Sequence, residues 1–204
     1  MKTKPKNYLC INGNITELTK EQLKQLGIIP ETCYLSEDGK IAHIGEYEFI
    51  VIKTDEKLGT TSLLLKDKLG EEMEFGSNND YRTSEIKKVL DEFANEISGI
   101  VGEENLVEHL VDLTADDGLK CYGSIKAKMS LFTANMVREN VEILDEFKLD
   151  EWWWTCTPYS TPKHENASWI KCVSPRGGIF NNFTFWNGGS VRPFCIVKSS
   201  IFVS

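Results

Sequence analysis

The chain has 204 residues, and its 41% hydrophobic and 10% aromatic content is enough for one large domain with a buried core. Its 23 basic and 31 acidic residues give a net charge of −8, which argues against nucleic acid and anionic membranes as direct ligands. The basic N-terminus lacks the apolar run of a secretory signal, and no other apolar run is long enough to span a membrane. The six cysteines contain no CxxC pair, so we expect reduced cysteines, no metal and no cofactor.

The first 30 residues differ in pattern from the rest of the chain. The stretch 7–13, NYLCING, has strand character, and 19–27, TKEQLKQLG, has the pattern of a short helix. We therefore predict a small appendage over residues 1–30, followed by a single domain over residues 31–204.

The main domain begins with strand patterns and continues with helical ones. Alternating apolar residues predict antiparallel strands in 40–54 and 60–68. Shorter helices are predicted for 103–113 and 133–144. The clearest helix is predicted for 84–99, where apolar residues recur at helical spacing at Ile86, Val89, Leu90, Phe93 and Ile97.

Beyond Asp150 the composition shifts to aromatic residues, Gly, Asn and Ser. Turn-forming residues such as PRGG divide this part of the chain into four predicted strands, namely 151–157, 168–174, 178–186 and 191–198. Strands therefore lie at both ends of the main domain, with two to three helices between them. This order predicts an α+β fold.

Three adjacent tryptophans open the first of these strands. Trp152 and Trp154 should point to one side and Trp153 to the other. Each buried indole removes roughly 150 to 250 Å² from water, so we predict a central strand that is covered on both faces. The helix at 84–99 is expected on one face and the C-terminal loops on the other.

Arg192 lies in the stretch SVRPFCIV, where its neighbours are apolar. A partly buried guanidinium needs several acceptors, so backbone carbonyls or a carboxylate should converge on it and lock loops onto the sheet. A ligand-binding role is the alternative. Pro193 cannot donate a ladder hydrogen bond, which predicts a bulge or an edge strand there. Structural roles are assigned to Trp152, Trp153, Trp154, Arg192 and Pro193.

The strand at 178–186 has two different faces. The mostly apolar face is expected to meet the core and carries Ile179, Asn181, Phe183 and Phe185. The opposite face mixes rings with amide and hydroxyl groups, as recognition surfaces do, unless the loop around His164 covers its rings. Together with nearby positions, the predicted ligand-binding residues are Tyr159, Lys171, Arg176, Phe180, Asn182, Thr184, Trp186 and Asn187.

The stretch DLTADDG at 112–118 is the only local pattern that suggests a metal site. A calcium loop needs Gly at its sixth position and Glu at its twelfth, but these positions hold Asp117 and Gly123. A solvated acidic turn is therefore expected. The three histidines form no HxH or HExxH pair, and no nucleophile elbow or phosphate loop is present, so no catalytic residues are assigned.

The order of these motifs resembles a domain of unknown function found in phage, prophage and Firmicute proteins, whose signature is WWLRSP followed by GVRP. The resemblance covers residues 45–197. The first signature is matched by Trp153, Trp154 and Pro158, and the second by Val191, Arg192 and Pro193. The chain departs from the signatures at Cys156, where Arg is usual, and at Ser190, where Gly is usual.

The C-terminal part is also similar to the C-type-lectin-like fold of formylglycine-generating enzymes and phage variable tropism proteins. This similarity implies a C-type-lectin-like domain with a binding face near the C-terminus. The catalytic relatives would imply a close pair of cysteines late in the chain. Here Cys195 follows Cys172 only at a large spacing, which argues against that chemistry.

Three functional hypotheses follow. The first is a non-enzymatic binding module of a phage or mobile element, cytoplasmic in a bacterial host or virion-associated, which recognises a protein or host-surface ligand and is open to forming a homo-oligomer. The alternative is an anti-CRISPR-like inhibitor of a host defence nuclease that mimics nucleic acid through Glu103, Glu104, Glu108 and Asp112. The third, a formylglycine-generating-type enzyme, is disfavoured by the cysteine spacing.

Overall fold

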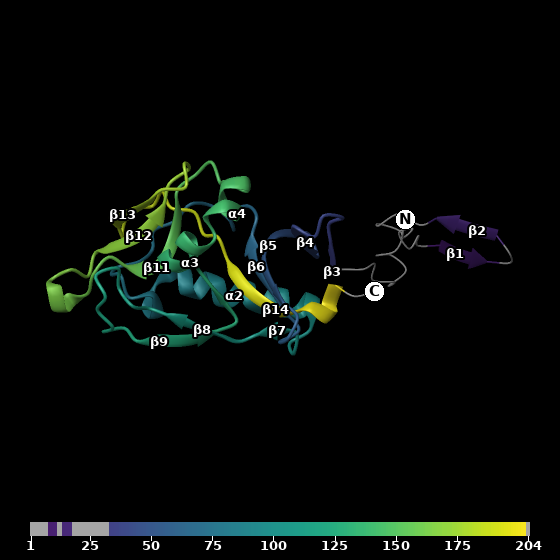
Figure 1. Ribbon diagram of the computed structural model, residues 1–204, viewed down its shortest axis with the longest axis horizontal. Coiled ribbons are helices and arrows are strands. Elements are labelled where there is room, and N and C mark those ends of the chain that lie inside the picture. Colours follow the sequence, from purple (N-terminus) through teal and green to yellow (C-terminus); the bar gives the residue numbers. More distant parts are fainter. Residues whose placement is uncertain (1–7, 12–13, 18–32, 203–204) are drawn as a thin grey trace. The chain divides into compact units, whose positions relative to one another are not determined.

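The structure is a computed structural model that describes residues 8–11, 14–17 and 33–202 (Figure 1). Contacts along the chain divide it into two compact units, residues 1–32 with Ser204 and residues 33–203.

The described part of the first unit is a pair of antiparallel strands, β1 (Tyr8–Ile11) and β2 (Asn14–Glu17). The first of them lies within the strand predicted for 7–13. The helix predicted for 19–27 lies outside the described residues.

A seven-stranded antiparallel sheet, the large sheet, organises the second unit (Figure 1). In chain order its strands are β3 (Cys33–Leu35), β4 (Ile41–Ile44), β5 (Tyr47–Asp55), β6 (Thr60–Leu65), β7 (Leu106–Val107), β10 (Met129–Ser130) and β14 (Phe194–Lys198). Across the sheet the order is β10-β14-β6-β5-β4-β3, and β7 also pairs with β14. The last strand of the domain therefore lies in the middle of the sheet, beside one of the earliest.

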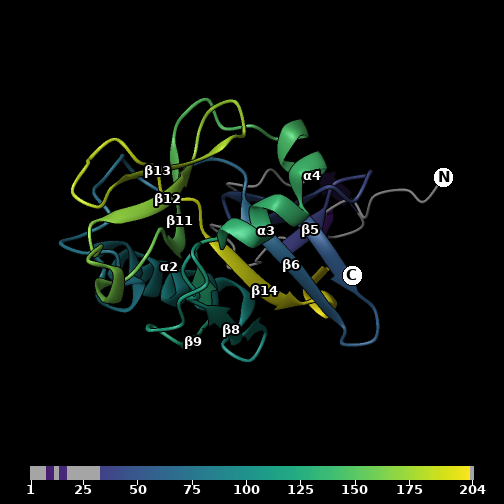
Figure 2. The ribbon, with the colours of Figure 1, turned by 60° about the vertical axis from the view of Figure 1, so that its left-hand side comes forward.

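Helices cover both faces of the large sheet (Figure 2). On one side, α2 (Glu85–Val101) packs against Cys195 and Val197 of β14 in the main core. On the other side, α3 (Ala134–Glu139) and α4 (Val141–Glu146) pack near Phe194 in a second core. Successive residues of β14 therefore enter different cores, which explains the continuous apolar run FCIV.

The apolar periodicity at 84–99 correctly predicts α2. Ser84 caps its N-terminus by accepting a hydrogen bond from Lys87 N. The helix predicted for 133–144 is divided into α3 and α4 at Asn140, whose φ of −121° leaves the helical range. Short 3₁₀ segments lie at Tyr81–Thr83, Pro162–His164 and Ser199–Phe202.

The prediction of a helix over residues 103–113 is wrong. This stretch forms β7 and then β8 (His109–Asp112), which pairs with β9 (Ser124–Ala127). Leu106 and Val111 are buried in these strands. Pairing with distant segments therefore overrides a helical pattern that was too short to stand alone.

A second, smaller antiparallel sheet contains β11 (Trp153–Pro158), β12 (Trp169–Val173) and β13 (Ile179–Phe183). All six residues of β11 are buried. The strands predicted at 151–157, 168–174 and 178–186 are thus confirmed. The fourth strand begins only at Phe194, directly after Pro193. Because β14 is paired on both sides and Pro193 lies before it, neither the bulge nor the edge position predicted for Pro193 is observed. The domain is an α+β fold built on antiparallel sheets, as predicted.

Candidate binding face

The small sheet has a core face and an open face. The core face carries Trp154, Cys156, Ile170 and Cys172, which are all fully buried in the main core. The open face carries alternate residues of β12 and β13, namely Trp169, Lys171 and Val173 of β12 and Ile179, Asn181 and Phe183 of β13. Trp153 and Val173 lie in the second core under α3 and α4, whereas the end with Trp169 and Phe183 is left uncovered.

The two faces of β13 are the reverse of those predicted. Its pairing sets Phe180 opposite Cys172 and Asn182 opposite Ile170, so these residues share the side of the core face. Thr184, which continues this face, is fully buried and therefore cannot form part of an exposed surface. By contrast, Phe183 and Phe185, which were expected to meet the core, are 38% and 60% exposed. Among the described residues no element covers this end of that side, so apolar composition alone did not indicate the buried face.

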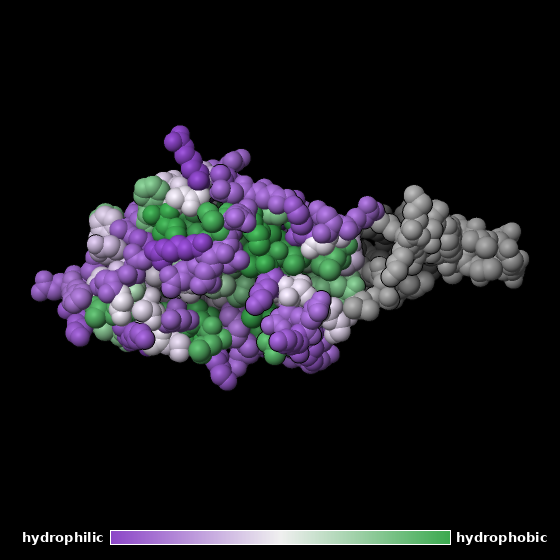
Figure 3. Space-filling view, viewed as in Figure 1, coloured by the Kyte–Doolittle hydropathy of each residue, from purple (hydrophilic) through white to green (hydrophobic). Residues whose placement is uncertain are grey.

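Four aromatic residues form a row across the open face, which we call the aromatic row: the exposed Tyr159, Phe183 and Phe185 and the half-buried Trp169. Tyr159 N donates to Trp169 O at 3.1 Å, and Trp169 lies opposite Phe183 with ring centroids 4.1 Å apart. Phe183 stacks on Phe185 with a centroid distance of 5.0 Å. Figure 3 shows hydrophobic side chains, framed by hydrophilic ones, over the part of the molecule where β12, β13 and α4 lie.

Beside this row, Asp116 gathers two cations. Lys171 Nζ lies 3.0 Å from Asp116 Oδ2, and Arg138 Nη2 donates to Oδ1 at 2.8 Å. Burial raises the pKa of Asp116, but the hydrogen bonds from Arg138 and Lys171 outweigh it and hold the pKa below its usual value. The Lys171 side chain is only 9% exposed, and its ammonium lies 5.9 Å from the centre of the Tyr159 ring. Lys171 is therefore neutralised within the domain.

Two cavities adjoin Asp116. One has a volume of about 370 Å³, and its lining includes Asp112, Lys120, Thr133 and Arg138. The other, which we call the Asp117 cavity, has a volume of about 330 Å³ and is lined by Asp116, Asp117, Tyr159, Ser160, His164 and Asn166. Both volumes fall at the lower end of the range for ligand pockets.

Asp117 anchors the loop that borders this cavity. Its Oδ2 accepts from Ser160 Oγ at 2.5 Å and faces His164 Nδ1 at 3.0 Å. The bond from Ser160, with contributions from Leu119 N and His164, lowers the pKa of Asp117. Serine and histidine meet the same carboxylate oxygen, whereas a nucleophilic triad needs the imidazole between them. This geometry favours a structural anchor over acyl transfer.

Asn79 holds the aromatic row and the cavity loop together. This side chain is fully buried, and its amide donates to Ser160 O at 3.0 Å and to Trp169 O at 2.9 Å. Its Oδ1 accepts from Tyr122 OH at 2.7 Å. Sequence reasoning missed Asn79, because an isolated Asn in GSNND gives no sign of partners about 80 residues away.

The remaining predicted binding residues are dispersed. Phe180 is 51% exposed at the sheet edge, against Trp152, while Trp186 packs between Trp152 and Trp154. Asn182 Oδ1 accepts from Phe183 N at 2.9 Å and so occupies a backbone donor. Arg176 and Asn187 are exposed in the turns that flank β13. Of the eight predicted residues, only Tyr159 and Lys171 lie together on the open face.

Residues assigned structural roles are mostly buried. Trp153 is 2% exposed and Trp154 is not exposed, while Trp152 is half-buried against the same core. Arg192 is 1% exposed and donates to three backbone carbonyls, those of Leu65, Lys66 and Phe147. Burial lowers the pKa of Arg192 to about 10. The guanidinium thus joins the end of β6 to the end of α4.

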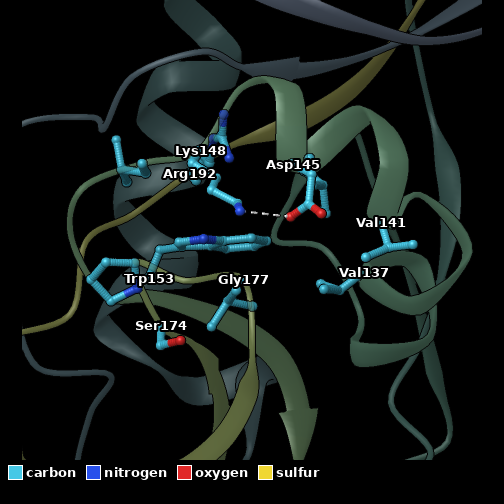
Figure 4. Close-up of a pocket in the computed structure, with 12 residues that line it drawn as sticks. Val137, Val141, Asp145, Lys148, Trp153, Ser174, Gly177 and Arg192 are labelled. Atoms are coloured by element: carbon cyan, nitrogen blue, oxygen red, sulfur yellow. Dashed lines mark ion pairs between the residues drawn. The ribbon is translucent and has the colours of Figure 1, made fainter.

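Figure 4 shows the Trp153 indole in a pocket beside Arg192, next to the ion pair of Lys148 and Asp145. The cavity there measures about 20 Å³, which is room for a single water molecule. Helices α3 and α4 cover this side, in place of the C-terminal loops that the sequence led us to expect. A stacking platform at Trp153 is therefore not available to a ligand of ordinary size.

The acidic cluster proposed to mimic nucleic acid is partly neutralised. Glu103 pairs with Lys128, and Glu108 Oε2 lies 3.4 Å from Lys126 Nζ. Asp112 accepts from Thr114 at 2.6 Å. Two of the four carboxylates thus carry a cation at their side, which weakens the case for a phosphate-like surface.

Three cysteines lie in the cores rather than in a cleft. Burial raises the pKa of Cys156, Cys172 and Cys195 to about 12. These thiols stay protonated at neutral pH, and a thiol is a much weaker nucleophile than a thiolate. Their environment is that of core packing.

Comparisons with known proteins identify no relative: no family model, curated protein or solved structure matches the chain. Within residues 8–11, 14–17 and 33–202, no helix is long and apolar enough to cross a membrane. The same residues contain no group of three or more His, Cys, Asp or Glu side chains that could hold a metal ion.

Proposed function

We propose that the domain is a non-enzymatic binding module of phage or mobile-element origin, and that it recognises a protein or host-surface ligand through the aromatic row. The origin is supported by the order of the motifs around Trp153, Trp154 and Val191 to Pro193. A C-type-lectin-like fold is supported by the same resemblance and by the pairing of β14 with β6, which joins strands from both ends of the domain.

The observation that carries the proposal is the exposure of three neighbouring rings. Tyr159, Phe183 and Phe185 are 41%, 38% and 60% exposed, although the chain has a large core in which rings could be buried. Contiguous exposed apolar side chains are unfavourable in water unless a partner covers them, and aromatic rings are enriched at the centres of interfaces. A binding face accounts for their position.

The row is also held rigidly. Trp169 and Phe183 lie in paired strands, and the loop that follows Tyr159 is fixed by Asn79. Rigid rings lose little conformational entropy on binding, so more of the burial free energy appears as affinity. This arrangement favours recognition by a preformed surface.

The test is the double substitution Phe183→Ser with Phe185→Ser. A partner captured from host lysate with the wild-type chain would be purified and titrated against both proteins by calorimetry. We expect binding to weaken by about 30-fold or more, as for the loss of about 2 kcal/mol at a hot spot, with little change in Tm.

The matched control is Leu58→Ser with Leu110→Ser, which removes two residues that are 75% and 68% exposed elsewhere on the domain. This variant should bind like the wild type. Unchanged binding by the phenylalanine variant would overturn the proposal, as would equal loss in both variants.

A further inference from the structure

We infer that the partner presents a cationic side chain, a guanidinium or an ammonium group, to the Asp117 cavity while an adjacent apolar side chain covers the aromatic row. This inference deepens the proposed function and rests on it. It assigns a chemical class to the partner segment: basic and apolar, with no phosphate.

The first support is the difference between two neighbouring carboxylates. Asp116 is bound by both Lys171 and Arg138, so its charge is compensated inside the domain. The described hydrogen-bonding groups around Asp117 are Ser160, Leu119 N and His164, and none of them is a Lys or Arg. Lys163 and Glu165 are both exposed on the adjoining loop, and their formal charges sum to zero. Of the two carboxylates that line the cavity, Asp117 is therefore the one to which no described Lys or Arg is bonded.

The second support is the wall of the cavity. The Tyr159 ring lines it and is 41% exposed. Aromatic faces attract cations, and this ring already has the Lys171 ammonium 5.9 Å from its centroid. A carboxylate and an exposed ring in one cavity of about 330 Å³ suit an organic cation better than an anion.

The third support is continuity with the aromatic row. Tyr159 belongs to both features, and Trp169 is its neighbour across the strands. Residues two apart in an extended segment lie on one side, roughly 7 Å from each other, and neighbouring strands are about 4.8 Å apart. A basic residue in the cavity therefore places the residue two positions away above Trp169 and Phe183.

The net negative charge of the chain also favours a cationic partner. The net charge of −8 attracts a basic partner at long range and accelerates its association at low salt. The exposed Arg176 lies at the turn between β12 and β13, at the end of the strands opposite Trp169 and Phe183. It is therefore placed away from the cation site.

The experiment titrates the full chain with the peptide N-acetyl-Leu-Gly-Arg amide and follows backbone NMR shifts. The control peptide carries citrulline, the neutral analogue of arginine, in place of Arg. We expect the arginine peptide to shift the resonances of Asp117, Tyr159 and Trp169 and to bind at least tenfold more tightly than the citrulline peptide. Raising the salt concentration should weaken the binding of the arginine peptide and leave the binding of the citrulline peptide unchanged.

Two substitutions separate local recognition from net charge. Asp117→Asn keeps the acceptor for Leu119 N at Oδ1 and places an amide donor beside Ser160 Oγ, which can accept from it. This variant should reduce the preference for arginine at least tenfold. Glu165→Gln removes the same charge from the adjoining loop and should leave that preference unchanged. Equal binding of both peptides, no binding of either, or equal loss in the two variants would overturn the inference.

The purified partner distinguishes this inference from the proposed function. If Phe183→Ser with Phe185→Ser weakens partner binding and Asp117→Asn does not, binding through the aromatic row is supported and the inference of a cationic partner is overturned. If the phenylalanine variant binds normally, the binding face itself is overturned.

Discussion

The two ends of the open face of the small sheet use similar residues in opposite ways. At one end Trp153 and Val173 are 2% exposed because α3 and α4 pack over them. At the other end, on the same side of the same sheet, Phe183 is 38% exposed and stacks on Phe185, which is 60% exposed. The two ends differ in whether helices pack over them, so the burial of an aromatic residue here depends on its neighbours in space more than on its residue type.

This contrast implies that substitutions in the covered parts should cost stability, whereas substitutions at the uncovered end should cost binding. The following predictions test that division, beginning with the largest expected effect.

The largest effect is expected at alkaline pH. In the unfolded chain the three buried thiols lose their protons near pH 9, but in the folded chain near pH 12. Between these values the folded state holds more protons, so the free energy of unfolding falls as pH rises, by roughly 1.4 kcal/mol per pH unit for each thiol. Below pH 9 this contribution is fully present.

Arg192 opposes this fall above about pH 10, where its folded form begins to lose a proton that the unfolded form keeps. Urea unfolding at pH 8, 9 and 10 measures the slope. Cys172→Ala should make it shallower by about 0.7 kcal/mol per pH unit over this range, because the unfolded thiol is only half deprotonated at pH 9. An identical slope in the variant and the wild type would show that burial of this thiol is not responsible.

Gly189→Ala should be the most damaging single substitution near the small sheet. A Cβ at Gly189 would lie 2.2 Å from Cε2 of Trp154, a fully buried indole whose Nε1 donates to Met73 O at 2.8 Å. The ring cannot move without breaking that bond, so we expect a loss of about 3 kcal/mol in urea unfolding. Gly99→Ala, at an open helical position, should instead add about 0.5 to 1 kcal/mol. Similar values for both would contradict close packing at Gly189.

Asn79→Ala should cost about 2 kcal/mol, because it removes the donor to Ser160 O, the acceptor of the Tyr122 hydroxyl and one of the two donors to Trp169 O. Amide hydrogen exchange in residues 160–169 should accelerate more than exchange in α2. The exposed Asn187→Ala serves as the control and should change neither quantity. Uniform acceleration over the whole domain would mean that Asn79 supports global stability and has no special effect on the loop.

The smallest effect on stability is expected for Phe183→Ser with Phe185→Ser. These rings are exposed on the uncovered end, so we expect less than about 1 kcal/mol in urea unfolding. A loss of several kcal/mol would show that the row belongs to the core and would remove the contrast between the two ends.

The sequence predicted best where a pattern has a single interpretation. The stripe from Ile86 to Ile97 fits only a helix, and the alternation before Thr54 fits only strands. The stretch 103–113 fits both helix and strand, and only its pairing with β14 and β9 decides between them. For Arg192, burial demanded acceptors, and three carbonyls supply them.

The proposed binding face was harder to predict. Strand periodicity correctly separated Phe183 from Asn182 but could not show which side the helices would cover. The contacts that define the site, from Asn79 to Trp169 and from Lys171 to Asp116, join segments 55 to 90 residues apart. Such pairs carry no local signal in one sequence.

The position of β14 has a consequence for how the chain acquires its structure. This strand fills the gap between β6 and β10, and its partner β6 precedes it by about 130 residues. During synthesis, the early hairpin of β5 and β6 must wait with one edge unpaired until residues 194–198 emerge from the ribosome. Closing so long a loop late makes folding slow and leaves an aggregation-prone edge exposed in the interval. The domain should therefore depend on chaperones more than a protein of its size with local topology would.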